Sequence, residues 1–153
     1  MKKLIYIVIF LILASCGFQP INNTLNYNFS FQQIEIMADP VIKKELNKFF
    51  SKDKNISNSS ENIYEIYING SSDRSISAKN SSGVATIYKI TIRLNVSVVS
   101  NKREIFKKNY SRNVQYNNQS SKFELKQYEN ILKKDLVKEI SFEIYDDIAY
   151  SND

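Results

Sequence analysis

The sequence predicts a single α+β domain, a two-layer sandwich in which a mostly antiparallel four-stranded sheet carries two helices on one face. Three observations lead to this fold class. The periodic segments follow the order strand, helix, strand, strand, strand, helix (β-α-β-β-β-α). Two of them repeat apolar residues at helical spacing, while the others alternate apolar and polar residues. The 153 residues include only 3 Gly and 2 Pro, which favours few, long elements.

The first fifteen residues lie outside this domain. Lys2 and Lys3 form a short positive region, residues 4–13 are an unbroken apolar run, and small residues follow it. A membrane-spanning helix needs about 20 apolar residues. The run therefore predicts a secretory signal peptide and not a transmembrane anchor.

Cys16 is the only cysteine of the chain. The run Leu13-Ala14-Ser15-Cys16 resembles the bacterial lipobox, in which the thiol receives a diacylglycerol, the signal is cut before the Cys, and the new amino terminus is acylated. The alternative is an ordinary signal peptide followed by a free, reactive Cys. The lipoprotein interpretation divides the chain into a signal peptide (1–15), a lipid-anchored tether (16–28) and a single periplasmic α+β domain (29–150).

The domain is expected to begin with a strand and a short helix. The apolar phase of residues 29–37 changes at Gln32-Gln33, which indicates a bulge or a strand buried on both faces. Asp39-Pro40 provides an N-cap followed by Pro at the first helical position. The helix then carries its apolar residues on one face: Ile42, Leu46, Phe49 and Phe50.

Three more strands are expected after a polar loop over residues 51–61. Residues 64–69 alternate, residues 70–73 are expected to interrupt that strand, and residues 80–83 (Asn-Ser-Ser-Gly) supply a turn. The clearest strand spans residues 88–98, because its even positions are all apolar or aromatic and its odd positions are polar or charged. One face of this strand must be buried and the other solvated.

A hairpin is expected to join this strand to a fourth one over residues 106–116. A three-residue loop would pair Val98 with Phe106 and Leu94 with Tyr110, so that the two apolar faces coincide.

The last expected element is a long helix. Residues 121–124 (Ser-Lys-Phe-Glu) fit a capping box at its start. An apolar stripe of about six turns follows, which is long enough to cover a sheet; it contains Leu125, Tyr128, Leu132, Leu136, Ile140 and Ile144, flanked by Ile131, Val137 and Tyr145.

The composition excludes several kinds of functional site. With no His and one Cys, the chain cannot build a Ser-His-Asp or Cys-His catalytic unit, a thiolate zinc cluster or an internal disulfide. No cofactor is expected apart from the diacylglycerol and N-acyl chain on Cys16. Loss of Lys2 and Lys3 with the signal lowers the net charge from +5 to +3, too little to argue for nucleic acid as a partner.

The expected location is the periplasmic side of the outer membrane. Several acyl chains anchor a protein stably where one chain would be marginal. Gly17 stands where Asp is associated with inner-membrane retention in enteric bacteria, so the position is similar to that of outer-membrane lipoproteins.

Two stretches, in this element order, resemble the LPS-assembly lipoprotein (LptE) family, especially its alphaproteobacterial type. Residues 16–20 (Cys-Gly-Phe-Gln-Pro) are similar to the Cys-Gly-Phe-x-Pro-Leu start of mature members, with Ile21 in place of Leu. Arg74-Ser75-Ile76-Ser77, Gly83 and residues 88–96 resemble the family's central hairpin, in which an Arg, a turn Gly and a Tyr begin a long alternating strand. The resemblance covers essentially the whole mature chain.

The resemblance implies a non-catalytic outer-membrane role. Members form a plug inside the LptD barrel, help it assemble and contact lipopolysaccharide, so the implied partners are LptD, lipopolysaccharide and, through Cys16, membrane lipid. The candidate lipopolysaccharide contacts are basic residues of the polar strand face and the turns: Lys89, Arg93, Lys107, Lys102, Arg103 and Arg74. An ordinary solvated sheet face would carry such charges too. Tyr67 is out of the apolar phase and is the better interface candidate among the aromatic residues.

Two other function classes remain open. The first is a different periplasmic lipoprotein adaptor, such as a secretin pilotin or an accessory subunit of a lipid transporter. The second is a carboxylate-based glycosidase, which is disfavoured because no pair of carboxylates is placed on converging elements; the glutamates considered are Glu61, Glu65, Glu104, Glu124, Glu139 and Glu143.

Overall fold

A computed structural model describes residues 29–51 and 62–151 of the chain. The predicted signal peptide (1–15), Cys16, the tether (16–28) and most of the predicted polar loop lie outside these residues. The elements are β1 (Phe29–Ala38), α2 (Pro40–Phe50), β2 (Asn62–Lys79), β3 (Ala85–Ser100), β4 (Arg103–Asn117) and α3 (Lys122–Tyr150).

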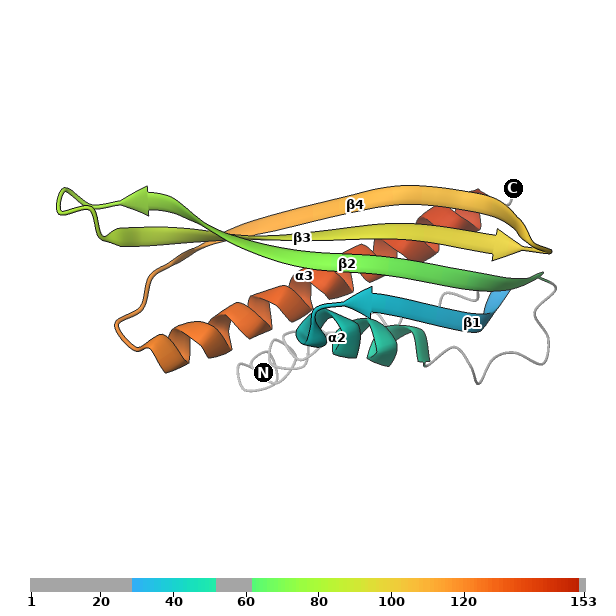
Figure 1. The fold of residues 1–153 in the computed structure, drawn as a ribbon, viewed down its shortest axis with the longest axis horizontal. Coiled ribbons are helices and arrows are strands. Elements are labelled where there is room, and N and C mark those ends of the chain that lie inside the picture. Colours follow the sequence, from blue (N-terminus) through green and yellow to red (C-terminus); the bar gives the residue numbers. More distant parts are fainter. Residues whose placement is uncertain (1–28, 52–61, 152–153) are drawn as a thin grey trace, which may run out of the picture.

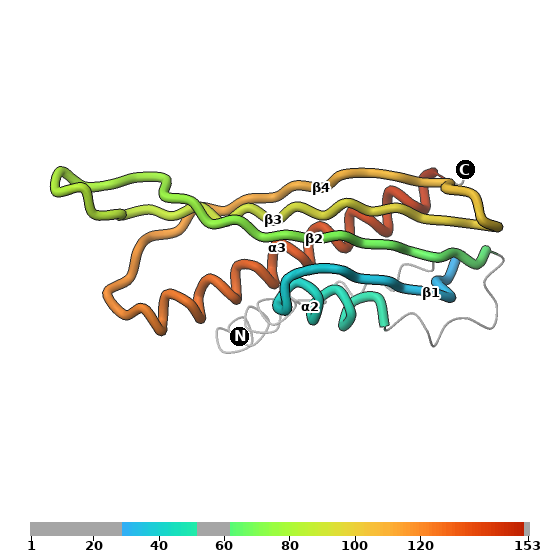
Figure 2. Tube along the Cα trace, in the orientation of Figure 1, coloured from blue at the N-terminus to red at the C-terminus, as the bar shows by residue number. Residues whose placement is uncertain are grey.

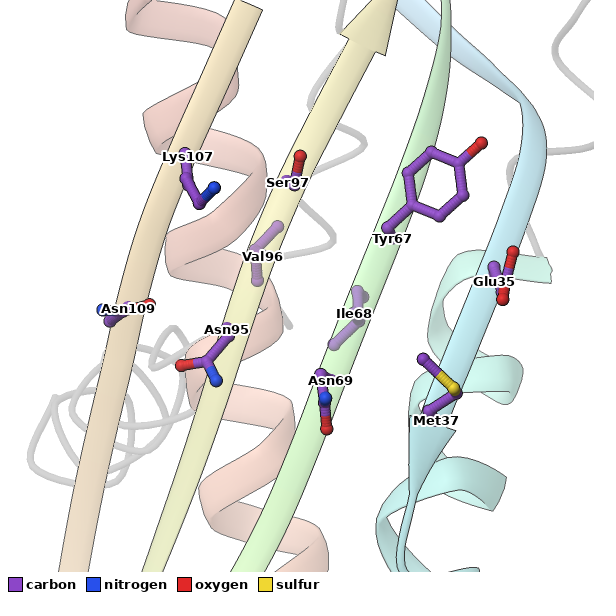
Figure 3. A pocket seen from close by; sticks show the side chains of 10 residues that line it. All are labelled: Glu35, Met37, Tyr67, Ile68, Asn69, Asn95, Val96, Ser97, Lys107 and Asn109. Atoms are coloured by element: carbon purple, nitrogen blue, oxygen red, sulfur yellow. The ribbon is translucent and has the colours of Figure 1, made fainter. Parts of the chain in front are cut away.

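The four strands form one sheet in the order β1-β2-β3-β4, and both helices lie on the same face of it (Figures 1 and 3). This confirms the predicted two-layer α+β sandwich. β2 pairs antiparallel with β3, and β3 with β4, whereas β1 runs parallel to β2. The sheet is mixed because α2 lies in the crossover connection that a parallel pair requires.

The predicted irregularity in β1 is a bulge. The register with β2 shifts between Phe31 and Gln33, which leaves Gln32 as the extra residue. Phe29 and Phe31 are buried before the shift, and Ile36 is buried after it. One inserted residue therefore explains the change of apolar phase.

The expected interruption at residues 70–73 is wrong. β2 is continuous, because each of these residues pairs with β3, from Gly70 opposite Leu94 to Asp73 opposite Thr91. β1 ends opposite Gly70, and Asp39 then leaves the sheet to begin α2. The Asp39 carboxylate does not cap its own helix; Oδ2 accepts hydrogen bonds from the Ser72 backbone N–H (3.1 Å) and Oγ (2.6 Å), so it satisfies an edge group that β1 no longer reaches.

The β3–β4 hairpin has the predicted register, with Val98 opposite Phe106 and Leu94 opposite Tyr110. Its turn is shorter than expected. Asn101 and Lys102 both have positive φ (49° and 64°), as a two-residue hairpin turn of type I′ requires. A register shift between Val98 and Val99 restores the alignment of the apolar faces.

The core lies between the sheet and the two helices. Ile66, Ile90, Ile92 and Leu94 are fully buried on the sheet side, and Ile42, Leu46, Ile140 and Ile144 on the helix side. At the end of the sheet near β1, rings from both layers pack together. Phe50 stacks on Tyr145 with centroids 5.2 Å apart, and Phe31 meets both rings edge-on.

The helices cover the two ends of the sheet to different extents (Figure 1). α3 starts at the predicted cap, where Ser121 Oγ accepts from the Glu124 N–H at 3.3 Å, and runs under the length of the sheet (Figure 2). β1 and α2 occupy only one end, and the β2–β3 hairpin projects beyond the start of α3 (Figure 1). Tyr128 and Ile131 are therefore 39% and 52% exposed, so the predicted apolar stripe is buried mainly in the C-terminal half of α3.

Candidate functional site

The candidate site is the sheet face that neither α2 nor α3 covers (Figures 1 and 3). Side chains at odd positions of β3 point to it, and even-numbered ones such as Ile92 and Leu94 are buried beneath the sheet. Arg93 and Asn95 are exposed as predicted. Thr91 is an exception with 8% exposure, because it sits on a central strand between Asp73 and Asn113 of the neighbouring strands.

Three of the predicted basic residues lie along this face. Lys89 and Arg93 are four residues apart on β3, about 13 Å at the usual rise of a strand. Lys107 on β4 pairs with Ser97, another four positions along β3. The three cations thus form a line and not a cluster.

The cations of this line differ in their partners. Lys107 Nζ lies 3.3 Å from Glu104 Oε2. Hydrogen bonds from Ser97 and Lys107 lower the pKa of Glu104. Within the part of the chain that the structure describes, neither Lys89 nor Arg93 makes an ion pair. These two charges are the ones available to an anionic ligand.

Lys102 and Arg103 lie at the β3–β4 turn, at one end of the sheet, and both are exposed. They continue the line of Lys89, Arg93 and Lys107 in the strand direction. A ligand large enough to follow the sheet would be needed to contact all five.

Arg74 is not part of this face. It pairs with Ile90 and points to the helix side of the sheet, where its guanidinium carbon lies 3.8 Å from the centroid of the Tyr88 ring and its Nε lies 3.0 Å from Glu129 Oε1. It borders a hollow of about 610 Å³ between the β2–β3 hairpin and the start of α3. Lys122 and Lys126 also line that hollow, which is therefore a second, separate basic region.

A smaller hollow of about 210 Å³ lies on the uncovered face (Figure 3). Sequence reasoning did not identify it, apart from Tyr67 and Lys107, because its residues meet only through strand pairing. Asn69, Asn95 and Asn109 are consecutive cross-strand partners. The other side chains that line it on this face are Glu35, Met37 and Ser97.

The comparisons with known proteins concern the whole domain. The family model for lipopolysaccharide-assembly proteins, LptE, matches residues 19–148. The chain belongs to the LptE family. No curated protein sequence matches this LptE-family chain significantly.

Several solved structures have the same fold as this LptE-family domain. Rare lipoprotein B from Shewanella oneidensis superposes with a TM-score of 0.62 at 13% identity and covers 78% of this chain and 96% of its own. Lipoprotein B from Nitrosomonas europaea has a TM-score of 0.52 at 16% identity, with coverages of 86% and 91%. A minor lipoprotein from Acinetobacter baumannii has a TM-score of 0.51 at 11% identity, with coverages of 78% and 94%. At these identities the similarity establishes the fold.

The LptE-family domain also holds an ion-pair network that the sequence pattern did not reveal. Lys108 and Arg112 share the even, helix-facing phase of β4, so they meet Glu143 and Asp147 of α3. Arg112 Nη2 lies 2.6 Å from Glu143 Oε2, and Lys108 Nζ lies 2.7 Å from Asp147 Oδ2. These contacts fasten the edge strand β4 to α3.

Two features are absent from the described residues. Within the described ranges 29–51 and 62–151, no three acidic or Cys side chains of this LptE-family protein come together as metal ligands. No helix in those ranges combines the length and the hydrophobicity that a membrane span needs.

Proposed function

We propose that this LptE-family protein is a non-catalytic outer-membrane lipoprotein that plugs the LptD barrel, helps it assemble and assists lipopolysaccharide transport to the outer leaflet. The observation that carries the proposal is the family match over residues 19–148, which includes every element of the domain except the last two residues of α3. The proteins of the same fold from Shewanella oneidensis and Acinetobacter baumannii are also lipoproteins.

The uncovered sheet face supports this role. It presents Asn, Ser and Gln side chains with Lys89 and Arg93 among them, and the lumen of a membrane barrel is likewise polar and hydrated. Charge-assisted hydrogen bonds from Lys and Arg to phosphate are the strong contacts in such a setting. A phosphorylated glycolipid would therefore find its charged partners at Lys89 and Arg93.

The lipid anchor belongs to the same proposal. Acylation of Cys16 would hold the domain at the periplasmic side of the outer membrane, and residues 17–28 would leave it free to enter a barrel. Three carboxylates of α3 support a non-catalytic role, because Glu129, Glu143 and Asp147 are each engaged in an ion pair with a strand of the sheet.

Co-purification tests the partner. Tagged full-length protein, extracted from outer membranes in mild detergent, should bring down LptD in stoichiometric amount. Recovery of a secretin or of a lipid-transporter subunit instead would favour the adaptor role. Recovery of no barrel protein would overturn the proposed function.

Charge reversal tests the glycolipid contact. Lys89→Glu with Arg93→Glu should weaken lipopolysaccharide binding, and the wild-type interaction should weaken with added salt because exposed charges are screened over about 10 Å at 0.1 M. Lys134→Glu is the matched control, since Lys134 is exposed on α3 away from the sheet face. Binding that is indifferent to the double reversal and to salt would remove these residues from the contact.

A further inference from the structure

The hollow on the uncovered face has a chemistry different from that of a phosphate site. Its three amides, Asn69, Asn95 and Asn109, stand in one row across β2, β3 and β4. Neighbouring strands are about 4.8 Å apart, so the row spans about 10 Å, the width of one sugar ring with its substituents. All three side chains are exposed.

The amides have free hydrogen-bonding capacity. Each Asn offers two N–H donors and one carbonyl acceptor. Within the described ranges, none of the three side chains hydrogen-bonds to another residue. A phosphate would use only their donors and a cation only their acceptors, whereas a hydroxyl group both donates and accepts. The row is therefore matched to a ligand with several hydroxyl groups.

Tyr67 adds an apolar platform beside the row. Its ring lies flat on the uncovered face, on the β1 side of β2 (Figure 3). Its hydroxyl donates to Glu65 Oε2 at 3.0 Å, and Glu65 Oε1 accepts from Gln32 Nε2 at 3.1 Å, so the ring is held in one orientation. An aromatic face fixed in this way can stack on the C–H face of a pyranose. Met37, 60% exposed and opposite Asn69, extends the apolar contact.

The charges around the hollow balance. Glu35, Tyr67, Ser97 and Lys107 form the next cross-strand row, with the two charges at its opposite ends. Lys107 is already paired with Glu104. Nearby, Arg93 is two residues from Asn95 on the same face, about 7 Å along the strand. A neutral ring in the hollow would thus leave a phosphate on an adjacent sugar within reach of Arg93.

We propose that this hollow binds one neutral pyranose ring of the glycolipid's saccharide, stacked on Tyr67 and hydrogen-bonded by Asn69, Asn95 and Asn109. The claim that the sugar belongs to the glycolipid rests on the proposed function. The claim that the ligand is a sugar rests on the three amides and the Tyr67 ring. The hollow fixes the sugar, while Lys89 and Arg93 meet phosphate farther along β3.

Calorimetric titration of the full-length protein in detergent tests this site. The probe is lipid-free, dephosphorylated lipopolysaccharide core oligosaccharide. We expect saturable binding that Tyr67→Ala and Asn95→Ala each weaken about tenfold or more, since each removes a main contact. Tyr67→Phe keeps the ring but loses the hydroxyl that orients it, and should bind more weakly than wild type but more tightly than Tyr67→Ala. Asn113→Ala, an exposed amide outside the hollow, is the matched control and should leave affinity unchanged.

Equal affinity in Asn95→Ala and Asn113→Ala, or binding of inorganic phosphate with none of the dephosphorylated oligosaccharide, would overturn the proposal. Circular dichroism is used to check that Tyr67→Ala is folded. Asn95→Ala tests the same site without loss of a ring. The two proposals fail separately. Wild-type protein that recovers LptD but binds no oligosaccharide overturns only the sugar site, whereas wild-type protein that recovers no barrel overturns the proposed function.

Discussion

The hydroxyl of Tyr110 donates a hydrogen bond of 2.7 Å to Oδ2 of Asp147, and this bond joins the edge strand β4 to the last turns of α3. Lys108 Nζ donates to the same oxygen, also at 2.7 Å. Burial raises the pKa of Asp147, but the hydrogen bonds from Lys108 and Tyr110 outweigh it and hold that pKa below its ordinary value. An ionised carboxylate thus fastens this edge of the sheet.

Asp147→Asn should remove an acid-sensitive part of the stability. A carboxyl group whose pKa is lower in the folded state stabilises above its unfolded-state pKa, about 3.9, and this contribution is lost as the pH falls through the folded-state pKa. We expect the variant to lose about 1 kcal/mol of unfolding free energy at neutral pH and much less near pH 2. Urea denaturation at both pH values measures the difference, with the exposed Asp135→Asn as control. The same loss at both pH values would contradict this role for Asp147.

The alternation of β3 predicts opposite responses at adjacent positions. Leu94→Asp places an unpaired charge in the core, where the native side chain is fully buried, and should unfold the domain or cost several kcal/mol. Asn95→Asp changes an exposed side chain and should alter stability by less than about 1 kcal/mol. Thermal melts of the two variants compare them directly, and comparable losses would show that the buried face is assigned wrongly.

Gly70 should not tolerate a side chain. A Cβ at this position would lie 2.7 Å from Leu94 Cδ2 and 3.1 Å from the Ala38 Cβ, in the region where β1 turns into α2. Gly70→Ala should therefore destabilise the domain by about 1–3 kcal/mol. Addition of Leu94→Ala should cost less in the Gly70→Ala background than in wild type, because it removes the clashing atom. Additive losses in this double-mutant cycle would place the strain elsewhere.

Cys16→Ser should abolish lipid attachment. The hydroxyl cannot take the place of the thiol in the lipobox, so the variant should remain uncleaved or be released from the membrane. Metabolic labelling with radioactive fatty acid measures this outcome, and label retained in the Ser variant would exclude Cys16 as the acylated residue. Ala14→Gly, a change between small residues before the Cys, should still incorporate label.

Local patterns predicted those parts of the fold that one segment determines. The two-residue period of residues 88–98 identified the buried face, and matching apolar phases set the register of Leu94 with Tyr110. The phase change at Gln32-Gln33 located the bulge in β1. Each of these signals depends on residues close together in the chain or on a short hairpin.

Features that depend on distant pairing were not predictable in the same way. The row of Asn69, Asn95 and Asn109 exists only because three strands align, and the sequence distributes its members over 41 positions. Arg74 was expected in the hairpin region over residues 70–83, after an interruption of the strand; in a continuous β2 it shares the phase of Ile66 and Ile68 and faces the helix side.

The length of β3 can be compared with the thickness of the membrane that the proposed barrel would cross. Its 16 residues extend about 53 Å at the usual rise per residue, while a bilayer with its headgroups is about 40–45 Å thick. The turns at Gly83 and Lys102 lie at opposite ends of this strand. If the domain lay along the axis of the proposed barrel, a strand of this length would be long enough to span the whole membrane with its headgroups.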